Sequence, residues 1–413
     1  MLRALVLIAL LSVVMTTSTA YPMTANLGSS YAVIFNGYSV CTDQLFRDLV
    51  SKYQNPMESY KVTTDDGYIL QLFRVQAKGS GISAGKEPVL VQHGLLDSAD
   101  NFVVNGESNS IVFLLSSHGF DVWVSNSRGN KYSRAHKTKN PSSKEFWDYS
   151  FHEMGKFDIP ANINFILGKT GKSKLTYIGH SQGTTQMFAA LGSEASDFIN
   201  KRVKKFIALA PVVFPSGLSD PVLARISTDT TLVKAINFLG INEALSGVCT
   251  MTFTKWLQDK FCLMASSFCS IILQMSDENP WYNNKAITST LSAHYPSGTS
   301  INSLLHFRQQ IINQDSIKPR FTLYDYGEVE NIKIYGKSTP TEYDLNRIQI
   351  PVRLFVGKQD KIATFKDSMV LSSILTKLKK DVKVYPIDNC GHGTFVWAND
   401  FMRIFNNILS ELK

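Results

Sequence analysis

The feature that most constrains this chain is the pentapeptide Gly179-His180-Ser181-Gln182-Gly183. The apolar run 175–178 precedes it and predicts a buried strand, while the run 184–191 that follows favours a helix. A glycine stands two residues from the serine on each side, and glycine tolerates the close contacts and unusual backbone angles of a tight turn. The pattern therefore predicts a strand, a sharp turn and a helix, with the Ser181 hydroxyl presented at the turn.

A serine in such a turn becomes a nucleophile when a base removes its proton and an acid orients that base. The motif is typical of the α/β-hydrolase fold, in which the acid and then the histidine follow the serine along the chain. Two later apolar runs, 351–357 and 382–386, predict strands that are followed by Asp360 and His392. Because active sites of parallel sheets lie at the carboxyl ends of the strands, we expect Ser181, Asp360 and His392 to form a catalytic triad.

Two other carboxylates compete for the role of the triad acid. Asp388 lies only four residues before His392, which is too close for the usual geometry. Asp367 falls inside a predicted helix. Asp360 is therefore the preferred acid.

Ester hydrolysis also needs hydrogen-bond donors for the oxyanion that develops in the transition state. In this fold one donor is the backbone N–H of the residue after the nucleophile, and the other comes from the loop after the third strand. These rules select Gln182 and Leu95, the latter in the loop after the strand-like run 88–92. His93 and His180 lie beside these positions, and we interpret them as structural side chains hydrogen-bonded into the turns.

Strand-like and helix-like runs alternate along most of the chain, which predicts an α/β architecture with a mostly parallel central sheet and helices on both faces. The expected hydrolase core covers 21–211 and 333–413, and a hairpin around residues 65–67 should extend one edge of the sheet. The apolar spacing in 395–412 predicts helical packing on one face of the sheet. The predicted strands are 59–63, 69–75, 89–92, 121–124, 175–178, 206–209, 352–355 and 382–385.

The alternation stops between the two parts of the core, over residues 212–332, a stretch that is too long for a plain loop. We predict a mainly helical cap inserted after the sixth strand. Residues 248–275 are unusually apolar, and we interpret them as a lid whose inner face meets acyl chains or a lipid surface. For any single residue of this segment an ordinary cap core is the preferred interpretation, whereas the lid is favoured for the segment as a whole.

The ordered motifs of the chain resemble those of the acid lipase family, the gastric and lysosomal acid lipases. The likeness extends over nearly the whole chain after residue 20, and it implies a triad of Ser181, Asp360 and His392 with Leu95 and Gln182 as oxyanion donors. After its histidine the family usually has an acid and later a glycine, whereas this chain has Thr394 and Ala398. The motifs that carry the resemblance are 60–70, 92–99, 124–130, 145–147, 158–161, 178–185, 208–212, 295–300 and 324–327.

The five cysteines are too few for a disulfide scaffold in a chain of 413 residues. The resemblance implies one disulfide in the region that holds Cys249, Cys262 and Cys269, with the pairing left open. We expect Cys41 and Cys390 to be free thiols, and Cys390 to be a packing residue. No cysteine and histidine cluster has the spacing of a metal site, so neither a metal nor a cofactor is expected.

The first 20 residues read as a secretory signal peptide: a basic start, an apolar stretch from Ala4 to Met15, and small residues before a cleavage point after Ala20. We expect no transmembrane segment in the mature chain, and a location outside the cell or in the lysosomal or endosomal lumen. No Asn-x-Ser/Thr site is present, so sorting through an N-glycan is not supported. The net charge of +8 favours anionic lipid surfaces, whereas the scattered lysines do not indicate nucleic-acid binding.

The sequence therefore predicts a lipase that hydrolyses carboxylic esters of neutral lipids, triacylglycerol or steryl ester, through an acyl-enzyme. Its partners would be the lipid ester substrate and, peripherally, the lipid–water interface. A carboxylesterase for soluble short-chain esters would use the same triad and is the alternative. A non-catalytic lipid carrier is a remote third hypothesis, because such proteins typically lack the nucleophile or the base. The sequence does not indicate the oligomeric state.

Overall fold

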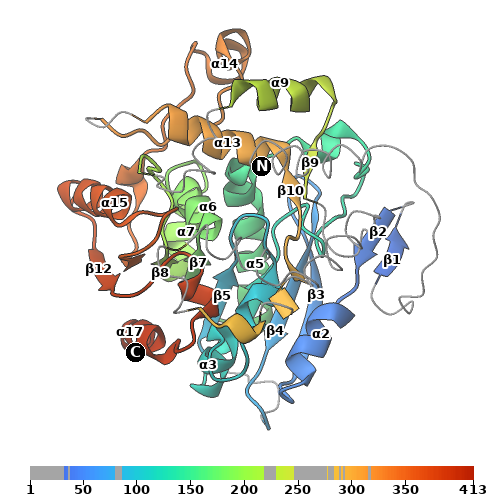
Figure 1. The fold of residues 1–413 in the computed structure, drawn as a ribbon, viewed down its shortest axis with the longest axis vertical. Coiled ribbons are helices and arrows are strands. Elements are labelled where there is room, and N and C mark those ends of the chain that lie inside the picture. The colour runs from blue at the N-terminus through green and yellow to red at the C-terminus, as the bar shows by residue number, and fades with distance from the viewer. Residues whose placement is uncertain are drawn as a thin grey trace.

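The computed structural model describes residues 32–35, 38–79, 86–217, 229–245, 277, 283–287, 290–291, 294–314 and 318–413. The predicted signal peptide and the predicted lid segment 248–275 lie outside the described residues. Figure 1 shows the arrangement of the described elements around one central sheet. Among the described residues, no helix has the length and apolar character needed to cross a membrane.

The central sheet has eight strands in the order β12-β11-β8-β7-β5-β6-β4-β3. Every pairing from β12 to β6 is parallel, and only β4–β6 and β3–β4 are antiparallel. The mostly parallel sheet and the hairpin at its edge are therefore confirmed. The strands are β3 Met57–Thr63, β4 Ile69–Val75, β5 Pro88–Gln92, β6 Asp121–Ser125, β7 Leu175–His180, β8 Val203–Leu209, β11 Val352–Gly357 and β12 Val382–Ile387.

Helices cover both faces of the sheet, because its central strands are apolar on both sides. Leu90 of β5 joins the core under one face, whereas its neighbours Val89 and Val91 join the core under the other. Strands buried on both faces read as continuous apolar runs rather than as alternating ones. The first face carries α5 Ile159–Thr170, α6 Gln182–Leu191 and α15 Phe365–Lys377, and the second carries α2 Gln44–Ser51, α3 Ile111–Ser117 and α17 Met402–Leu412.

The C-terminal run 395–412 packs on the second face as predicted, but it forms two helices. The short α16 Thr394–Trp397 ends where Ala398 adopts an extended conformation, and α17 begins at Met402. Ala398 pairs in an isolated bridge with Asn283, and its carbonyl accepts a hydrogen bond from Asn105 Nδ2 at 2.8 Å. These contacts with distant residues interrupt a helix that the local spacing alone favours.

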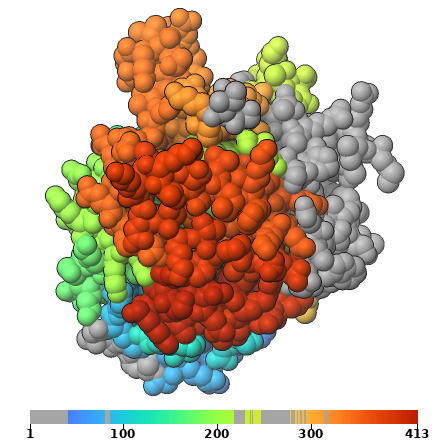
Figure 2. Space-filling view, turned by 90° about the vertical axis from the view of Figure 1, so that its left-hand side faces the viewer, coloured from blue at the N-terminus to red at the C-terminus, as the bar shows by residue number. Residues whose placement is uncertain are grey.

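The stretch between β8 and β11 holds mainly helices among the residues described. Figure 1 places α9, α13 and α14 together on one side of the sheet, at the top of the view. In Figure 2 an orange lobe that includes α14 stands out at the top of the face formed by the C-terminal part of the chain. Helix α14 spans residue 332, and the domain boundaries remain a prediction. The described elements are α9 Thr230–Phe238, β9 Glu243–Ala244, a 3-10 turn Lys285–Ile287, β10 Thr299–Ser300, α13 Ile301–Ile312, α14 Glu328–Tyr335 and a 3-10 turn Leu345–Arg347.

The two cysteines among the described residues differ from each other. Cys390 is a buried free thiol, as expected. Cys41, at the end of β2 Tyr38–Cys41, is disulfide-bonded, so the prediction of a free thiol there is wrong. Its partner lies outside the described residues. Chain spacing gave no signal for this bond, because pairing between distant cysteines depends on the tertiary fold.

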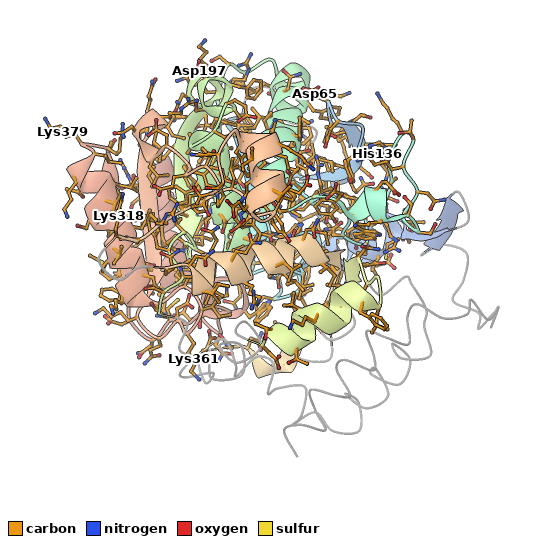
Figure 3. All side chains as sticks on the ribbon, turned by 90° about the horizontal axis from the view of Figure 1, so that it is seen from above. Asp65, His136, Asp197, Lys318, Lys361 and Lys379 are labelled. Carbon is orange, nitrogen blue, oxygen red and sulfur yellow. The ribbon has the colours of Figure 1, made fainter. Side chains whose placement is uncertain are left out.

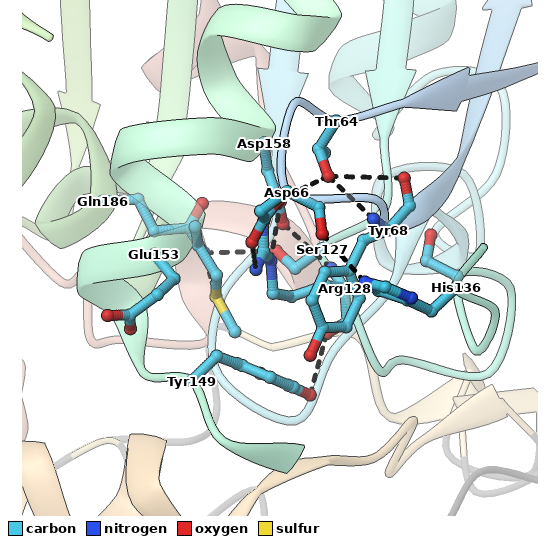
Figure 4. A network of polar contacts seen from close by, with 12 residues as sticks. Thr64, Asp66, Tyr68, Ser127, Arg128, His136, Tyr149, Glu153, Asp158 and Gln186 are labelled. Atoms are coloured by element: carbon cyan, nitrogen blue, oxygen red, sulfur yellow. Dashed lines mark hydrogen bonds and ion pairs between the residues drawn. The ribbon is translucent and has the colours of Figure 1, made fainter. Parts of the chain in front are cut away.

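A buried arginine joins three segments of the core, as Figure 4 shows. Arg128, in the loop after β6, donates from Nε to Asp158 Oδ1 at 2.8 Å and from Nη1 to Asp66 Oδ2 at 2.6 Å. Its guanidinium lies 4.0 Å from the ring centre of Tyr68. The side chains of Arg128 and Asp158 are each 1% exposed, so the pair is shielded from solvent. This cluster fixes the β3–β4 hairpin and the start of α5 against the β6 loop.

We predict that Arg128→Met lowers the free energy of unfolding by about 3–5 kcal/mol, because Asp158 would remain buried without its charge partner. Urea unfolding followed by circular dichroism measures this change. Arg347→Met is the matched control, because Arg347 is half exposed and lies 3.7 Å from its partner Asp344. Such exposed ion pairs contribute about 0–1 kcal/mol to stability. Equal decreases in the free energy of unfolding of the two variants would show that the buried Arg128–Asp158 pair contributes no more than an exposed pair.

Candidate active site

The turn between β7 and α6 places Ser181 at the carboxyl edge of the sheet. Ser181 has φ 53° and ψ −120°, a backbone conformation that L residues rarely adopt. The two glycines leave no room for side chains: a Cβ on Gly179 would lie 2.8 Å from the carbonyl carbon of Gly183, and one on Gly183 would lie 2.5 Å from the carbonyl oxygen of Gln92. The predicted strand, sharp turn and helix are all present.

The structure brings the three predicted triad residues together from the ends of three strands. The Ser181 Oγ lies 2.8 Å from His392 Nε2, and His392 Nδ1 lies 2.9 Å from Asp360 Oδ2. A carboxylate only accepts hydrogen bonds, so Nδ1–H donates to Asp360 and Nε2 is left to accept the Ser181 hydroxyl proton. This arrangement has the geometry of a nucleophile, a general base and an orienting acid.

The loop after β11 holds the Asp360 carboxylate in place. Its Oδ1 accepts hydrogen bonds from the backbone N–H groups of Ile362 and Ala363, both at 2.8 Å, which leaves Oδ2 for His392. The competing acids lie elsewhere. Asp388 is exposed and paired with Lys358, and Asp367 accepts from Ser216 and Gly217 at the start of α15. Both carboxylates are therefore engaged by other partners, whereas Asp360 contacts the histidine ring, so the geometry favours Asp360.

The predicted oxyanion donors lie on the two segments that meet at the serine. Gln182 is the first residue of α6, where helical N–H groups have no partner within the helix. Leu95 follows Gly94, and a Cβ on Gly94 would lie 3.1 Å from the Ser181 Cβ. The next residue, Leu96, has φ 60°, and its carbonyl accepts a hydrogen bond from Ser297 N at 2.7 Å. The loop therefore passes close to the nucleophile, and the roles of both N–H groups remain a prediction.

The two flanking histidines are hydrogen-bonded as the sequence suggested. His93 lies between Gly94 O at 2.8 Å and the backbone N–H of Ser127 at 3.0 Å, and burial lowers its pKa to about 4. His180 Nε2 lies 3.1 Å from the carbonyl oxygen of His392, and burial together with the charge of His392 lowers its pKa to about 3. Both rings are therefore neutral, and His180 supports the loop that carries His392.

The site is buried and contains one acid that the sequence analysis missed. Ser181, His392 and Asp360 are all at most 9% exposed, whereas charged residues such as Asp197 and Lys379 lie at the rim of the molecule (Figure 3). Burial lowers the pKa of His392, but the charge and hydrogen bond of Asp360 and the charge of Asp277 outweigh it and raise that pKa. Asp277 belongs to the inserted stretch and carries no motif that could have indicated it.

The part of the chain that the structure describes contains no assembled set of metal ligands. No group of three or more histidine, cysteine, aspartate or glutamate side chains there is placed to hold a metal ion.

Comparison with protein families agrees with this geometry. Residues 87–399 match the family model of the alpha/beta hydrolase fold, and residues 46–106 match a partial alpha/beta-hydrolase lipase region. A crystal structure from Sulfolobus solfataricus, of a protein with a provisional lipase assignment, has a TM-score of 0.53 and 16% identity. It covers 87% of this chain and 95% of that chain, which shows the shared fold.

Curated relatives are similar over most of their length. The human lysosomal acid lipase/cholesteryl ester hydrolase is 34% identical over 382 residues, which cover 90% of this chain and 91% of the relative. The gastric triacylglycerol lipase of Rattus norvegicus is 34% identical over 376 residues, 88% of this chain and 90% of the relative. With its α/β-hydrolase fold and these relatives, the chain belongs to the acid lipase family of serine-dependent carboxylic ester hydrolases.

Proposed function

We propose that this protein is a lipase that cleaves carboxylic esters of long-chain fatty acids in neutral lipids, either triacylglycerols or steryl esters. The observation that carries the proposal is the hydrogen-bonded series Ser181, His392 and Asp360. The names of the human and rat relatives, a cholesteryl ester hydrolase and a triacylglycerol lipase, support the substrate class.

Acyl transfer through Ser181 is the proposed mechanism. The Ser181 Oγ attacks the ester carbonyl while His392 Nε2 takes its proton, and Asp360 stabilises the imidazolium that forms. The backbone N–H groups of Leu95 and Gln182 stabilise the oxyanion. His392 then gives its proton to the departing alcohol, and it later activates the water that releases the fatty acid from the acyl-enzyme.

The exposed apolar side chains of the inserted stretch support contact with a lipid surface. Phe238 at the end of α9 is 90% exposed, and Val329 and Ile332 of α14 are 66% and 51% exposed. Both helices lie on the same side of the sheet in Figure 1. Large exposed apolar residues in one region typically mark an interaction site, and a water-insoluble substrate requires one. The proposed role of the lid segment 248–275 rests on sequence alone.

The place of action proposed for the enzyme is the secretory pathway, either outside the cell or in the lysosomal or endosomal lumen. The predicted signal peptide supports it, as do the names of the lysosomal and gastric relatives.

A carboxylesterase for soluble short-chain esters remains the alternative, since the same triad would serve it. The two functions differ in their acyl chain-length preference and in their response to an interface.

We expect Ser181→Ala to reduce the turnover of emulsified triolein and cholesteryl oleate by on the order of 10⁴-fold or more, because the nucleophile is lost. Steady-state assays of purified protein measure this loss. They cover pH 4 to 8, roughly the range of the expected compartments. An unchanged melting temperature would show that the variant is folded. Retention of more than about a tenth of the activity would remove Ser181 from the mechanism.

Asp360→Asn should lower kcat by on the order of 10³–10⁴-fold, because His392 would lose its acceptor and favour the wrong tautomer. Asp388→Asn is the matched control, since it removes the same charge from an exposed carboxylate near His392 in sequence. The control should remain within about two-fold of wild type, in line with the small effect of an exposed ion pair. A larger loss in Asp388→Asn than in Asp360→Asn would show that Asp360 is not the triad acid.

The double variant Val329→Ser/Ile332→Ser should weaken binding to triolein droplets by about ten- to thirty-fold, because each of these exposed apolar side chains contributes about 1 kcal/mol when a lipid surface covers it. Turnover of dissolved p-nitrophenyl butyrate should not change. Met369→Ser on α15, which removes a similarly exposed side chain outside the inserted stretch, is the control. Unchanged droplet binding, together with a preference for dissolved short esters, would favour the carboxylesterase.

A further inference from the structure

A second carboxylate, from the inserted stretch, lies against the loop that carries the triad histidine. Asp277 is 1% exposed, and its backbone pairs with that of Asp360 in an isolated antiparallel bridge. Its Oδ1 accepts a hydrogen bond from the backbone N–H of Gly393 at 3.0 Å. One residue therefore contacts the segments that hold both the acid and the base of the triad.

The packing between this carboxylate and the histidine loop is tight. A Cβ on Gly391 would lie 2.1 Å from Asp277 Oδ1, so the loop approaches closely enough to require glycine. The Thr394 hydroxyl accepts from Gly391 N at 3.0 Å and lies 3.4 Å from Asp277 Oδ2. The carboxylate thus meets the residues just before and just after His392.

Asn283 completes the arrangement and anchors it to the C-terminal segment. Its Nδ2 donates to Asp277 Oδ2 at 2.5 Å, and its backbone pairs with Ala398. Its carbonyl accepts from Asn399 Nδ2 at 3.1 Å. Asp277 is therefore held from a second direction and has little freedom to move away from the histidine loop.

We propose that Asp277 is a positioning residue for His392: its buried carboxylate fixes the 391–394 loop, so that the imidazole stays aligned between Ser181 and Asp360. This inference rests on the proposed function, because it assigns a role relative to the base of that reaction. Misplacement of a reacting group by about 1 Å can reduce the rate of catalysis by about 100-fold. A carboxylate with three partners around the loop provides such alignment without touching the substrate.

The same contact has an electrostatic consequence. Burial raises the pKa of Asp277 to about 6, the charge of Asp360 adds to this effect, and the hydrogen bonds from Asn283 and Gly393 and the charge of His392 oppose it. Ionised Asp277 in turn raises the pKa of His392. Removal of that charge therefore lowers the pKa of His392, so the neutral imidazole that acts as base persists to lower pH.

The other titratable groups around the two side chains do not supply this charge. His180 is neutral, because its pKa is lowered to about 3. Burial raises the pKa of the Cys390 thiol well above its ordinary value, so this thiol is also neutral. Among the described residues, Asp360 and Asp277 are the carboxylates whose charges raise the pKa of His392 most.

The test is the rate at which a serine-directed phosphonate inactivates the full-length enzyme, measured from pH 4 to 8, a window of about two units on either side of the Asp277 titration. Asp277→Asn keeps an acceptor oxygen for Gly393 N–H. Once the Asn283 amide turns over, the new amide can donate to Asn283 Oδ1, which has no partner among the described residues. We expect its plateau rate to stay within about two-fold of wild type, and its acid limb to move down by roughly 0.5–1 pH unit. Asp277→Ala, which loses the acceptor, should lower the plateau by about ten-fold or more.

The controls separate this inference from the proposed function. Asp388→Asn should leave both the plateau and the acid limb unchanged, because Asp388 is exposed and paired with Lys358. If wild-type enzyme is not inactivated and Ser181→Ala behaves identically, the proposed function fails. If wild type reacts at Ser181 while Asp277→Asn keeps the wild-type acid limb, or Asp277→Ala keeps the wild-type plateau, the role of Asp277 is overturned.

Discussion

The backbone contact between α6 and the end of β5 is the constraint on which the rest of the site depends. With no side chain on Gly183, the first turn of α6 lies so near the Gln92 carbonyl that a Cβ would stand only 2.5 Å from it. Ser181, at the apex of the turn that leads into this helix, has a positive φ of 53°, and its N–H donates to Leu209 O at 3.0 Å. The close approach brings the β5 loop with Gly94 against the serine. One close contact therefore sets the direction of the nucleophile and the position of the loop that faces it.

The sequence predicts most of the core because its signals are local. Buried parallel strands appear as continuous apolar runs, and the residues just after them are the ones that gather at one edge of the sheet. Ser181, Asp360 and His392 could be selected for this reason, although 211 residues separate the serine from the histidine. The hairpin at the edge of the sheet follows from an equally local signal, the turn residues 65–67 between two strand-like runs.

The features that the sequence did not predict depend on contacts between distant segments. The break at Ala398 depends on Asn283 and Asn105, and the bonded state of Cys41 depends on a partner far along the chain. Asp277 is an isolated aspartate in a stretch without strand or motif signals, and only the tertiary fold places it against Gly393. Local periodicity carries no information about such pairs.

Two described residues of the inserted stretch bond to loops of the candidate active site. Asp277 bonds to the histidine loop, and Ser297, shortly before α13, donates from its backbone N–H to Leu96 O beside the candidate oxyanion donor. This makes the stretch a poor module for exchange between related enzymes. Consider a chimaera in which a cap from another enzyme replaces the segment between β8 and β11. Unless that cap kept both anchoring residues, His392 would be misaligned and the loop that carries Leu95 would lose a hydrogen bond that holds it in place. In this protein, specificity is therefore easier to change by point substitution within the cap than by exchange of the whole cap.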